Sequence, residues 1–312
     1  MRRIAAPALI FAAIALVPLL PLGGERGLVL LLIARAMVFG LAALSLDVLL
    51  GLGGMVSFGH AAYLAIGAYA VAILDANNIS EALIVVPIAM LASAAFATAT
   101  GAVALRTRGV NFIMITLAFA QMLFFALGSL SSYGGDDGYT LYDRTELLGR
   151  PVLKGLGHYY VCLGFLVLAY VFCRVLAASR FGRVLRAARQ NEERVESLGY
   201  RVLAYRLAAM AIGAALCGLA GVLLVNGAEF ASPSYGTWQR SGELLVMVIL
   251  GGAGSLHGAL LGAGAVVLLE EGLGRLTEHW RLIFGPLLVL SVLYFRGGLA
   301  GICPTWIKRV RK

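Results

Sequence analysis

Hydrophobic residues form long blocks along the chain, separated by short polar segments. Most blocks hold about 20 residues, which as a helix cross the roughly 30 Å hydrocarbon core of a bilayer. Lipid offers backbone groups no hydrogen-bond partner, and strands of a membrane barrel need only about ten residues, so these blocks predict helices. The blocks run approximately over residues 4–22, 28–50, 55–74, 82–105, 109–130, 157–178, 204–226, 236–252, 255–271 and 281–297. We therefore expect an all-α, polytopic membrane protein with about eight to ten transmembrane helices in a single domain over residues 1–312.

Composition agrees with the membrane assignment. The chain is 61% hydrophobic and 13% charged, whereas a soluble domain carries about 25% charged residues. Its 39 glycines indicate close helix packing or local helix breaks. The cysteines are widely spaced and form no pair or cluster with histidine, so we interpret them as core residues and expect no metal or cofactor. They are Cys162, Cys173, Cys217 and Cys303.

Lysine and arginine accumulate in cytoplasmic loops and so indicate orientation. With the amino terminus inside and alternating crossings, most of the 25 basic residues fall on one face, at 2–3, 106–108, 174–206 and 296–312. We therefore expect both termini in the cytoplasm and residues 131–157 as the largest outer loop. The net charge of +9 then reflects topology and contact with anionic lipid rather than nucleic-acid binding.

The segment from Leu244 to Leu269 carries no charge and has glycines in its middle. It is too long for one comfortable span and too short for two full ones. Two short crossings and a re-entrant hairpin both keep the basic carboxyl terminus inside, so the charge pattern is compatible with either.

The cytoplasmic loop 179–206 has the apolar spacing of an amphipathic helix, with Gly199 suited to a helix C-terminus and a bend predicted at Gln190-Asn191. One interpretation is an interfacial helix held by anionic lipid. The other, which we favour, is a docking surface for a cytoplasmic subunit, because the loop combines an apolar stripe with arginine and glutamate charges.

A carboxylate within a membrane helix, such as Asp47, usually marks a partner or a water-filled cavity. Arg35 lies about 18 Å away along a straight helix, so it cannot pair with Asp47 and is interpreted as extending toward the membrane surface. After Asp47 the glycines predict a helix break near 51–57.

The pattern Gly-Gly-x-x-Ser of this break recurs near 251–258, followed in both places by glycine, histidine and alanine. Paired glycine interruptions in a transporter point to a binding site, because broken helices expose backbone groups to a polar ligand. A chance match and a packing role for each histidine are the simpler alternatives.

Two further polar groups are candidates. Asn111, Thr116 and Gln121 lie in one apolar block, where they either line a pathway or bond neighbouring helices. Asp136 and Asp137 lie in the outer loop, which either receives a soluble partner or is merely solvated.

Several catalytic motifs are missing. No glycine is followed by lysine, so the chain has no phosphate-binding loop with which to energise transport. An intramembrane hydrolase using Ser57 with His257, or Ser255 with His60, has only residue type in its favour.

Ordered segments over most of the chain resemble the M-type permease subunit of branched-chain amino-acid ATP-binding cassette (ABC) importers. They are LSLDVLLGLGGMVSFGHAAYLAIGAYA (44–70), ITLAFAQML (115–123), GGDDG (134–138), SRFGRVLRAARQNEERVESLGY (179–200), AEFASPSYG (228–236), ELLVMVILGGAGSLHGALLGA (243–263) and FRGGLAGI (295–302). The family commonly has asparagine at the position of Asp47 and a coupling segment richer in alanine.

The resemblance implies a non-enzymatic permease of the bacterial inner membrane that works by alternating access. Its expected partners are a second permease, two cytoplasmic ATPases and a periplasmic binding protein. The expected solutes are branched-chain or other hydrophobic amino acids, with urea, short amides or another small polar solute as the alternative.

Three groups of residues carry these expectations. Those expected along the solute pathway are Asp47, Gly53, Gly54, Ser57, His60, Asn111, Thr116, Gln121, Gly251, Gly252, Ser255 and His257. Those expected to couple to the ATPase are Arg186, Arg189, Asn191, Glu192, Glu193, Glu196, Leu198 and Gly199. Asp136 and Asp137 are expected to dock the binding protein.

Overall fold

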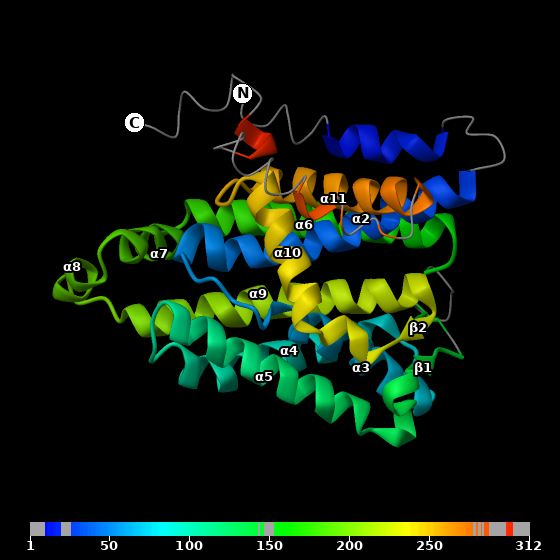
Figure 1. The fold of residues 1–312 in the computed structure, drawn as a ribbon, viewed down its shortest axis with the longest axis horizontal. Helices are drawn as coiled ribbons and strands as arrows, with labels where there is room; N and C mark the ends of the chain where they lie inside the picture. Colours follow the sequence, from blue (N-terminus) through cyan, green and yellow to red (C-terminus); the bar gives the residue numbers. More distant parts are fainter. Residues whose placement is uncertain are drawn as a thin grey trace.

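The structure, a computed structural model, describes residues 10–19, 26–142, 144–146, 153–276, 279, 282, 284–286 and 298–301. Most of its long helices lie along one axis, and α10 crosses them at an angle (Figure 1). The long elements are α2 (Arg26–Asp47), α3 (His60–Ala76), α4 (Ala82–Ala104), α5 (Val110–Gly128), α6 (Leu156–Ala178), α9 (Val202–Ala228), α10 (Trp238–Gly251) and α11 (Leu256–Leu276). The expectation that both termini are cytoplasmic, and the predicted block 281–297, fall largely outside the described residues.

Six helices in the described part of the chain are long and apolar enough to cross a membrane: α2 with its continuation to Leu52, α4, α5, α6, α9 and α11. Two shorter apolar helices cover Ile10–Leu19 and α3. The predicted block 55–74 is shorter as a helix because the chain between Gly54 and Gly59 is not helical. The helix continuing α2 over Val48–Leu52 is a π-helix, a form often found at functional sites.

The uncharged segment 244–269 forms two helices, α10 and α11, joined by a turn at Gly252–Ser255. Helix α10 has 14 residues, which corresponds to only about 21 Å. Between the outer end of the bundle and the start of α10, the chain forms the short 3-10 helix Pro233–Gly236. The hairpin therefore combines a full-length helix with a shorter one that begins inside the bundle.

Helix α9 lies at the centre, where 78% of its most apolar window is buried, against 22% in α4 and in α5. Glycines allow α3 to cross it closely: a side chain at Gly67 would collide with the carbonyl of Gly218, and one at Gly221 with the carbonyl of Leu64. Small residues promote this backbone contact in membranes, where lipid removes the hydrophobic drive for helix association.

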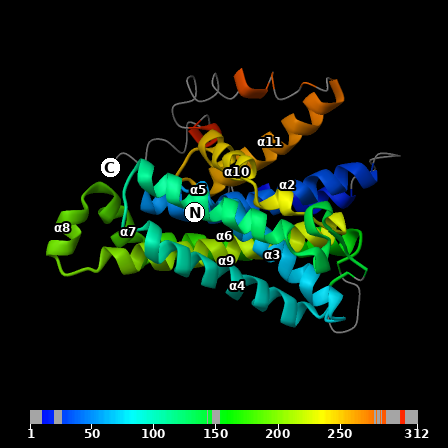
Figure 2. The ribbon, with the colours of Figure 1, turned by 60° about the horizontal axis from the view of Figure 1, so that its bottom comes forward.

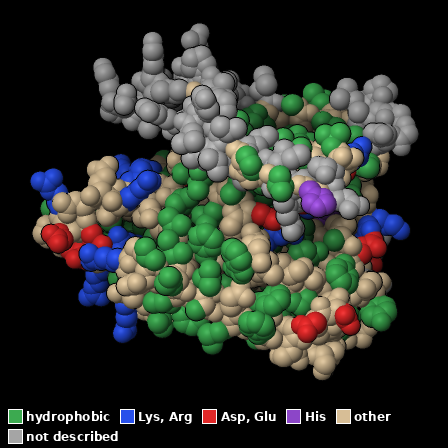
Figure 3. All heavy atoms as spheres, in the orientation of Figure 1, with side chains coloured by type: hydrophobic (Ala, Val, Ile, Leu, Met, Phe, Trp, Pro, Cys, Tyr) green, Lys and Arg blue, Asp and Glu red, His purple; other side chains and the backbone are tan. Residues whose placement is uncertain are grey.

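The two ends of the bundle differ in structure. At one end, β1 (Tyr139–Thr140) pairs antiparallel with β2 (Phe230–Ala231), with Tyr139 opposite Ala231. At the other end, α7 (Arg180–Gln190) and α8 (Glu192–Ser197) project beyond the bundle (Figure 2). Basic side chains gather at this end, and hydrophobic side chains cover the middle (Figure 3). By the charge rule, the α7–α8 end faces the cytoplasm.

Candidate functional site

The two glycine-rich breaks predicted from the sequence lie against one another. The carboxylate Oδ1 of Asp47, at the end of α2, accepts a hydrogen bond of 2.7 Å from the backbone N–H of Gly254 in the α10–α11 turn. Asp47 is 1% exposed. The buried carboxylate therefore has a backbone partner 207 residues away in sequence.

Glycine is required where these segments meet. A Cβ atom on Gly51 would lie 2.5 Å from Asp47 Oδ1 and 2.6 Å from the Cα of Gly254. Gly254 also has a φ of +87°, a conformation that side chains with a Cβ disfavour. The break near 51 and the turn near 254 therefore meet closely because Gly51 has no side chain and because Gly254 adopts a backbone conformation that favours glycine.

The cytoplasmic helix α7 reaches the same place. Arg189 Nη1 donates a hydrogen bond of 2.7 Å to the backbone carbonyl of Gly51. The stem of Arg189 lies over Gly54, where an added Cβ would be 2.8 Å from Arg189 Cγ. We call this meeting of Asp47, Gly51, Gly254 and Arg189 the glycine junction.

The serines and His60 of the breaks are hydrogen bonded within the protein. Ser57 Oγ accepts from the backbone N–H of Gly59, and Ser255 Oγ donates to the carbonyl of Gly252. His60 is fully buried, and its Nε2 lies 2.8 Å from Ser45 Oγ. The partner of His60 is thus Ser45, on α2, rather than the Ser255 that a hydrolase would use.

The three polar residues of α5 do not share one environment. Asn111 is exposed, Thr116 is buried and Gln121 is half-buried. The backbone carbonyl of Thr116 lies where a Cβ on Gly59 would be only 2.6 Å away, so α5 passes close to the start of α3. The amide nitrogen of Gln121 is buried and has no hydrogen-bond partner among the described residues.

The loop 179–206 forms the expected pair of helices. Ser179 caps α7 by accepting from the N–H of Gly182. Asn191 has extended backbone and caps α8 by accepting from the N–H of Arg194, which confirms the predicted bend. Gly199 has a φ of +87°, as expected for a glycine just beyond a helix end.

The glutamates of α8 have different surroundings. Glu192 pairs with Arg206 at 2.9 Å and with Arg108 at 3.5 Å, which fastens α8 to α9 and to the α4–α5 connection. Glu193 and Glu196 are exposed. Leu198 is 71% exposed, so the tip presents an apolar side chain beside exposed carboxylates. This combination is typical of a protein docking surface, where a desolvated apolar anchor is surrounded by polar groups.

At the opposite end, Asp136 and Asp137 are exposed. The loop that carries them is fixed by Asp75 at the end of α3, which accepts hydrogen bonds from Tyr139 Oη and from the N–H of Tyr142. Burial, and next the nearby Asp75 charge, raise the pKa of Tyr139 to about 12. Tyr139 therefore stays protonated and donates this hydrogen bond at physiological pH.

The sequence interpretation missed two polar pairings. Arg35 does not extend to the membrane surface but pairs with Glu270 of α11 at 3.2 Å. Ser45 is hydrogen bonded to His60. In the sequence, Ser45 is a single small residue within an apolar block, with nothing to distinguish it from a packing residue. The presence of charges of opposite sign in two apolar blocks could have indicated the first pairing.

Comparisons with known proteins identify the family of this chain. Residues 28–292 match the family described as branched-chain amino acid transport system / permease component. The chain belongs to this permease family. It is 29% identical to the high-affinity branched-chain amino acid transport system permease protein LivM of Salmonella typhimurium, over 84% of this chain and 68% of that protein. No solved structure matches.

Other relatives are more partial. A probable branched-chain amino acid transport permease protein LivM of Methanocaldococcus jannaschii is 31% identical over 45% of each chain. The autoinducer 2 import system permease protein LsrC of Escherichia coli is 29% identical over 49% of this chain and 46% of its own length.

As a member of the permease family, the protein is a multi-pass subunit of an ABC importer in the bacterial inner membrane. It is a transport subunit and not an enzyme, and it works with ATPase and substrate-binding partners.

Proposed function

We propose that this permease translocates branched-chain or other hydrophobic amino acids by alternating access. It would act beside a second permease subunit, above two ATPase subunits, and receive solute from a periplasmic binding protein. The family match over residues 28–292 and the similarity to LivM over 84% of the chain support this assignment.

The observation that carries the coupling step is the hydrogen bond between Arg189 and the Gly51 carbonyl. Helix α7 belongs to the α7–α8 hairpin, which projects beyond the bundle. Gly51 lies in the π-helix that continues α2. A displacement of the α7–α8 hairpin by an ATPase would therefore act directly on the glycine junction. We propose the exposed tip, with Glu193, Glu196 and Leu198, as the ATPase contact, beside Arg186, Asn191 and Gly199.

The proposed solute pathway follows the polar and glycine positions of the bundle. It passes the Gly53–Gly54 and Gly251–Gly252 breaks and the α5 face around Thr116 and Gln121. At the outer end, Asp136 and Asp137 are exposed and carry negative charge, so we propose that they contact the binding protein.

A different small polar solute is the second candidate. The partial similarity to the autoinducer 2 import system permease protein LsrC favours this candidate, because it shows that related chains serve other cargo. Solute competition in an uptake assay distinguishes the two.

The docking proposal is tested with two charge reversals on α8. Glu193→Lys changes an exposed carboxylate and should leave the fold intact, while lowering solute uptake per ATP hydrolysed about three- to tenfold. Glu192→Lys should instead lower the thermal stability, because it breaks the pairing with Arg206 and Arg108. The measurements are copurification with the ATPase, ATP hydrolysis and uptake. If Glu193→Lys copurifies and transports like the unmodified protein, the docking surface is misplaced.

A further inference from the structure

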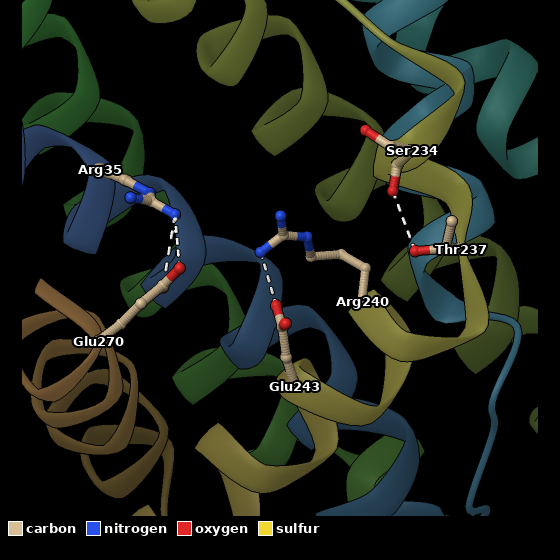
Figure 4. Close-up of polar contacts among 6 residues, drawn as sticks. All are labelled: Arg35, Ser234, Thr237, Arg240, Glu243 and Glu270. Carbon is tan, nitrogen blue, oxygen red and sulfur yellow. Dashed lines mark hydrogen bonds and ion pairs between the residues drawn. The ribbon is translucent and has the colours of Figure 1, made fainter. Parts of the chain in front are cut away.

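Two ion pairs from three helices have their arginines beside the same phenylalanine in the membrane domain. Arg35 of α2 pairs with Glu270 of α11 at 3.2 Å, and Arg240 of α10 pairs with Glu243 at 2.6 Å. Figure 4 shows the guanidinium groups of Arg35 and Arg240 pointing toward one another, each with its glutamate partner. The guanidinium carbons of Arg35 and Arg240 lie 5.7 and 5.5 Å from the centroid of the Phe39 ring. We call these five residues the Phe39 cluster.

The cluster lies deep in the bundle. Arg240 precedes Gly251, the cytoplasmic end of α10, by 11 residues, or about 16 Å of helix. The neighbouring Ser241 accepts a hydrogen bond from the N–H of Ala61, at the start of α3. Both α3 and α10 therefore begin at this depth. Transporters bind solutes where such discontinuous helices start, because the helix ends leave backbone donors available.

The ion pairs leave hydrogen-bonding capacity unused. Arg35 binds Glu270 through Nη2 alone, and Arg240 binds Glu243 through Nη1 alone. Among the described residues, the other guanidinium nitrogens and Glu243 Oε1 have no hydrogen-bond partner. The four charged side chains are 22% to 35% exposed, so solvent or a ligand can reach them.

The start of α10 adds further donors. Its preceding residue, Thr237, gives no side-chain cap to the first turn, and its hydroxyl instead donates to the carbonyl of Ser234 (Figure 4). The first N–H groups of α10 thus add positive potential beside Arg240.

We propose that the Phe39 cluster is the solute-binding site of the permease and takes the zwitterionic head of an α-amino acid. The solute carboxylate binds the unused N–H groups of Arg35 and Arg240, and its ammonium binds Glu243. The cluster carries two positive and two negative charges, so a zwitterion adds no net charge to the membrane interior. A solute with only a carboxylate or only an amine adds a net charge to this part of the membrane domain, which is costly. This inference rests on the proposed function.

The test is direct binding of leucine to the detergent-purified importer complex without its binding protein. We expect leucine to bind, and isoamylamine and 4-methylpentanoate, which lack the carboxylate and the ammonium respectively, to bind at least tenfold more weakly. Arg35→Gln and Arg240→Gln should each weaken leucine binding about ten- to a hundredfold, the usual loss for one hydrogen bond to a charged group. Arg275→Gln is the matched control, because Arg275 pairs with Glu271 on the exposed side of α11.

A double variant separates binding from a purely structural ion pair. Arg240→Glu combined with Glu243→Arg keeps the pair and the net charge but exchanges their positions. A structural role predicts that leucine affinity is restored, whereas a binding role predicts that it stays low. Leucine binding that is equal in Arg35→Gln, Arg240→Gln and Arg275→Gln overturns the inference. If the unmodified complex fails to import leucine with ATP, the proposed function itself is wrong, so the two failures are distinguishable.

Discussion

Asp47 shows how a single residue in an apolar block acquires its role from a distant part of the chain. The sequence indicates that a buried carboxylate needs a partner, and the nearest cation, Arg35, is too far away along the helix. The partner is the backbone N–H of Gly254. Which backbone group meets a side chain depends on the packing of α2 against the α10–α11 turn, and local sequence contains no signal for it.

The hydrogen bond predicts different outcomes for two changes at Asp47. Asp47→Asn keeps an acceptor oxygen and should retain nearly full thermal stability. Asp47→Leu removes the acceptor of the hydrogen bond from the Gly254 N–H and should lower the free energy of unfolding by about 1–3 kcal/mol, the usual contribution of a hydrogen bond to a charged group. Thermal melting of the purified complex measures both, and equal stability of the two variants would contradict the assigned contact.

Gly51 offers a second residue-level prediction. Gly51→Ala places a Cβ within 2.6 Å of the Gly254 backbone, so the two breaks must separate, and both stability and uptake should fall. Gly164→Ala on α6 is the control, because nothing lies within 4 Å of its added Cβ and alanine favours a helix by about 1 kcal/mol over glycine. Similar melting temperatures for the two variants would show that the junction is not tightly packed.

At the scale of the helices, the sequence predicts the bends and ends that depend on neighbouring residues. The α7–α8 bend at Asn191 and the end at Gly199 followed from capping chemistry, since polar and glycine residues satisfy helix ends in known ways. The uncharged segment 244–269 is compatible with both two short crossings and a re-entrant hairpin, because hydrophobicity alone does not determine how far a helix extends across the membrane. The hairpin of α10 and α11 depends on contacts with α2 and α3 that hydropathy does not report.

The contact between α7 and the glycine junction predicts a coupling defect. Arg189→Ala removes the hydrogen bond to the Gly51 carbonyl without touching the tip proposed to bind the ATPase. The complex should assemble and hydrolyse ATP, with uptake per ATP reduced about tenfold. Arg183→Ala is the control, an exposed arginine on the same helix. Equal uptake per ATP in both variants would remove Arg189 from the coupling route.

In the whole molecule, the three regions proposed to carry function are arranged along one axis. The α7–α8 hairpin forms the cytoplasmic end, the glycine junction lies where it meets the bundle, and the Phe39 cluster lies about 16 Å further along α10. The sequence predicted the first region and the glycines of the second. It missed the third, because Arg35, Arg240, Glu243 and Glu270 come from three helices and become neighbours only in the folded bundle.

The central claim is that this permease couples ATP hydrolysis on partner subunits to amino-acid import. The most direct measurement is uptake of radiolabelled leucine into proteoliposomes that contain the complete importer and its binding protein. We predict uptake that requires hydrolysable ATP and is competed by isoleucine and valine but not by urea. Uptake without ATP, or transport of urea or another small polar solute in place of leucine, would contradict the account.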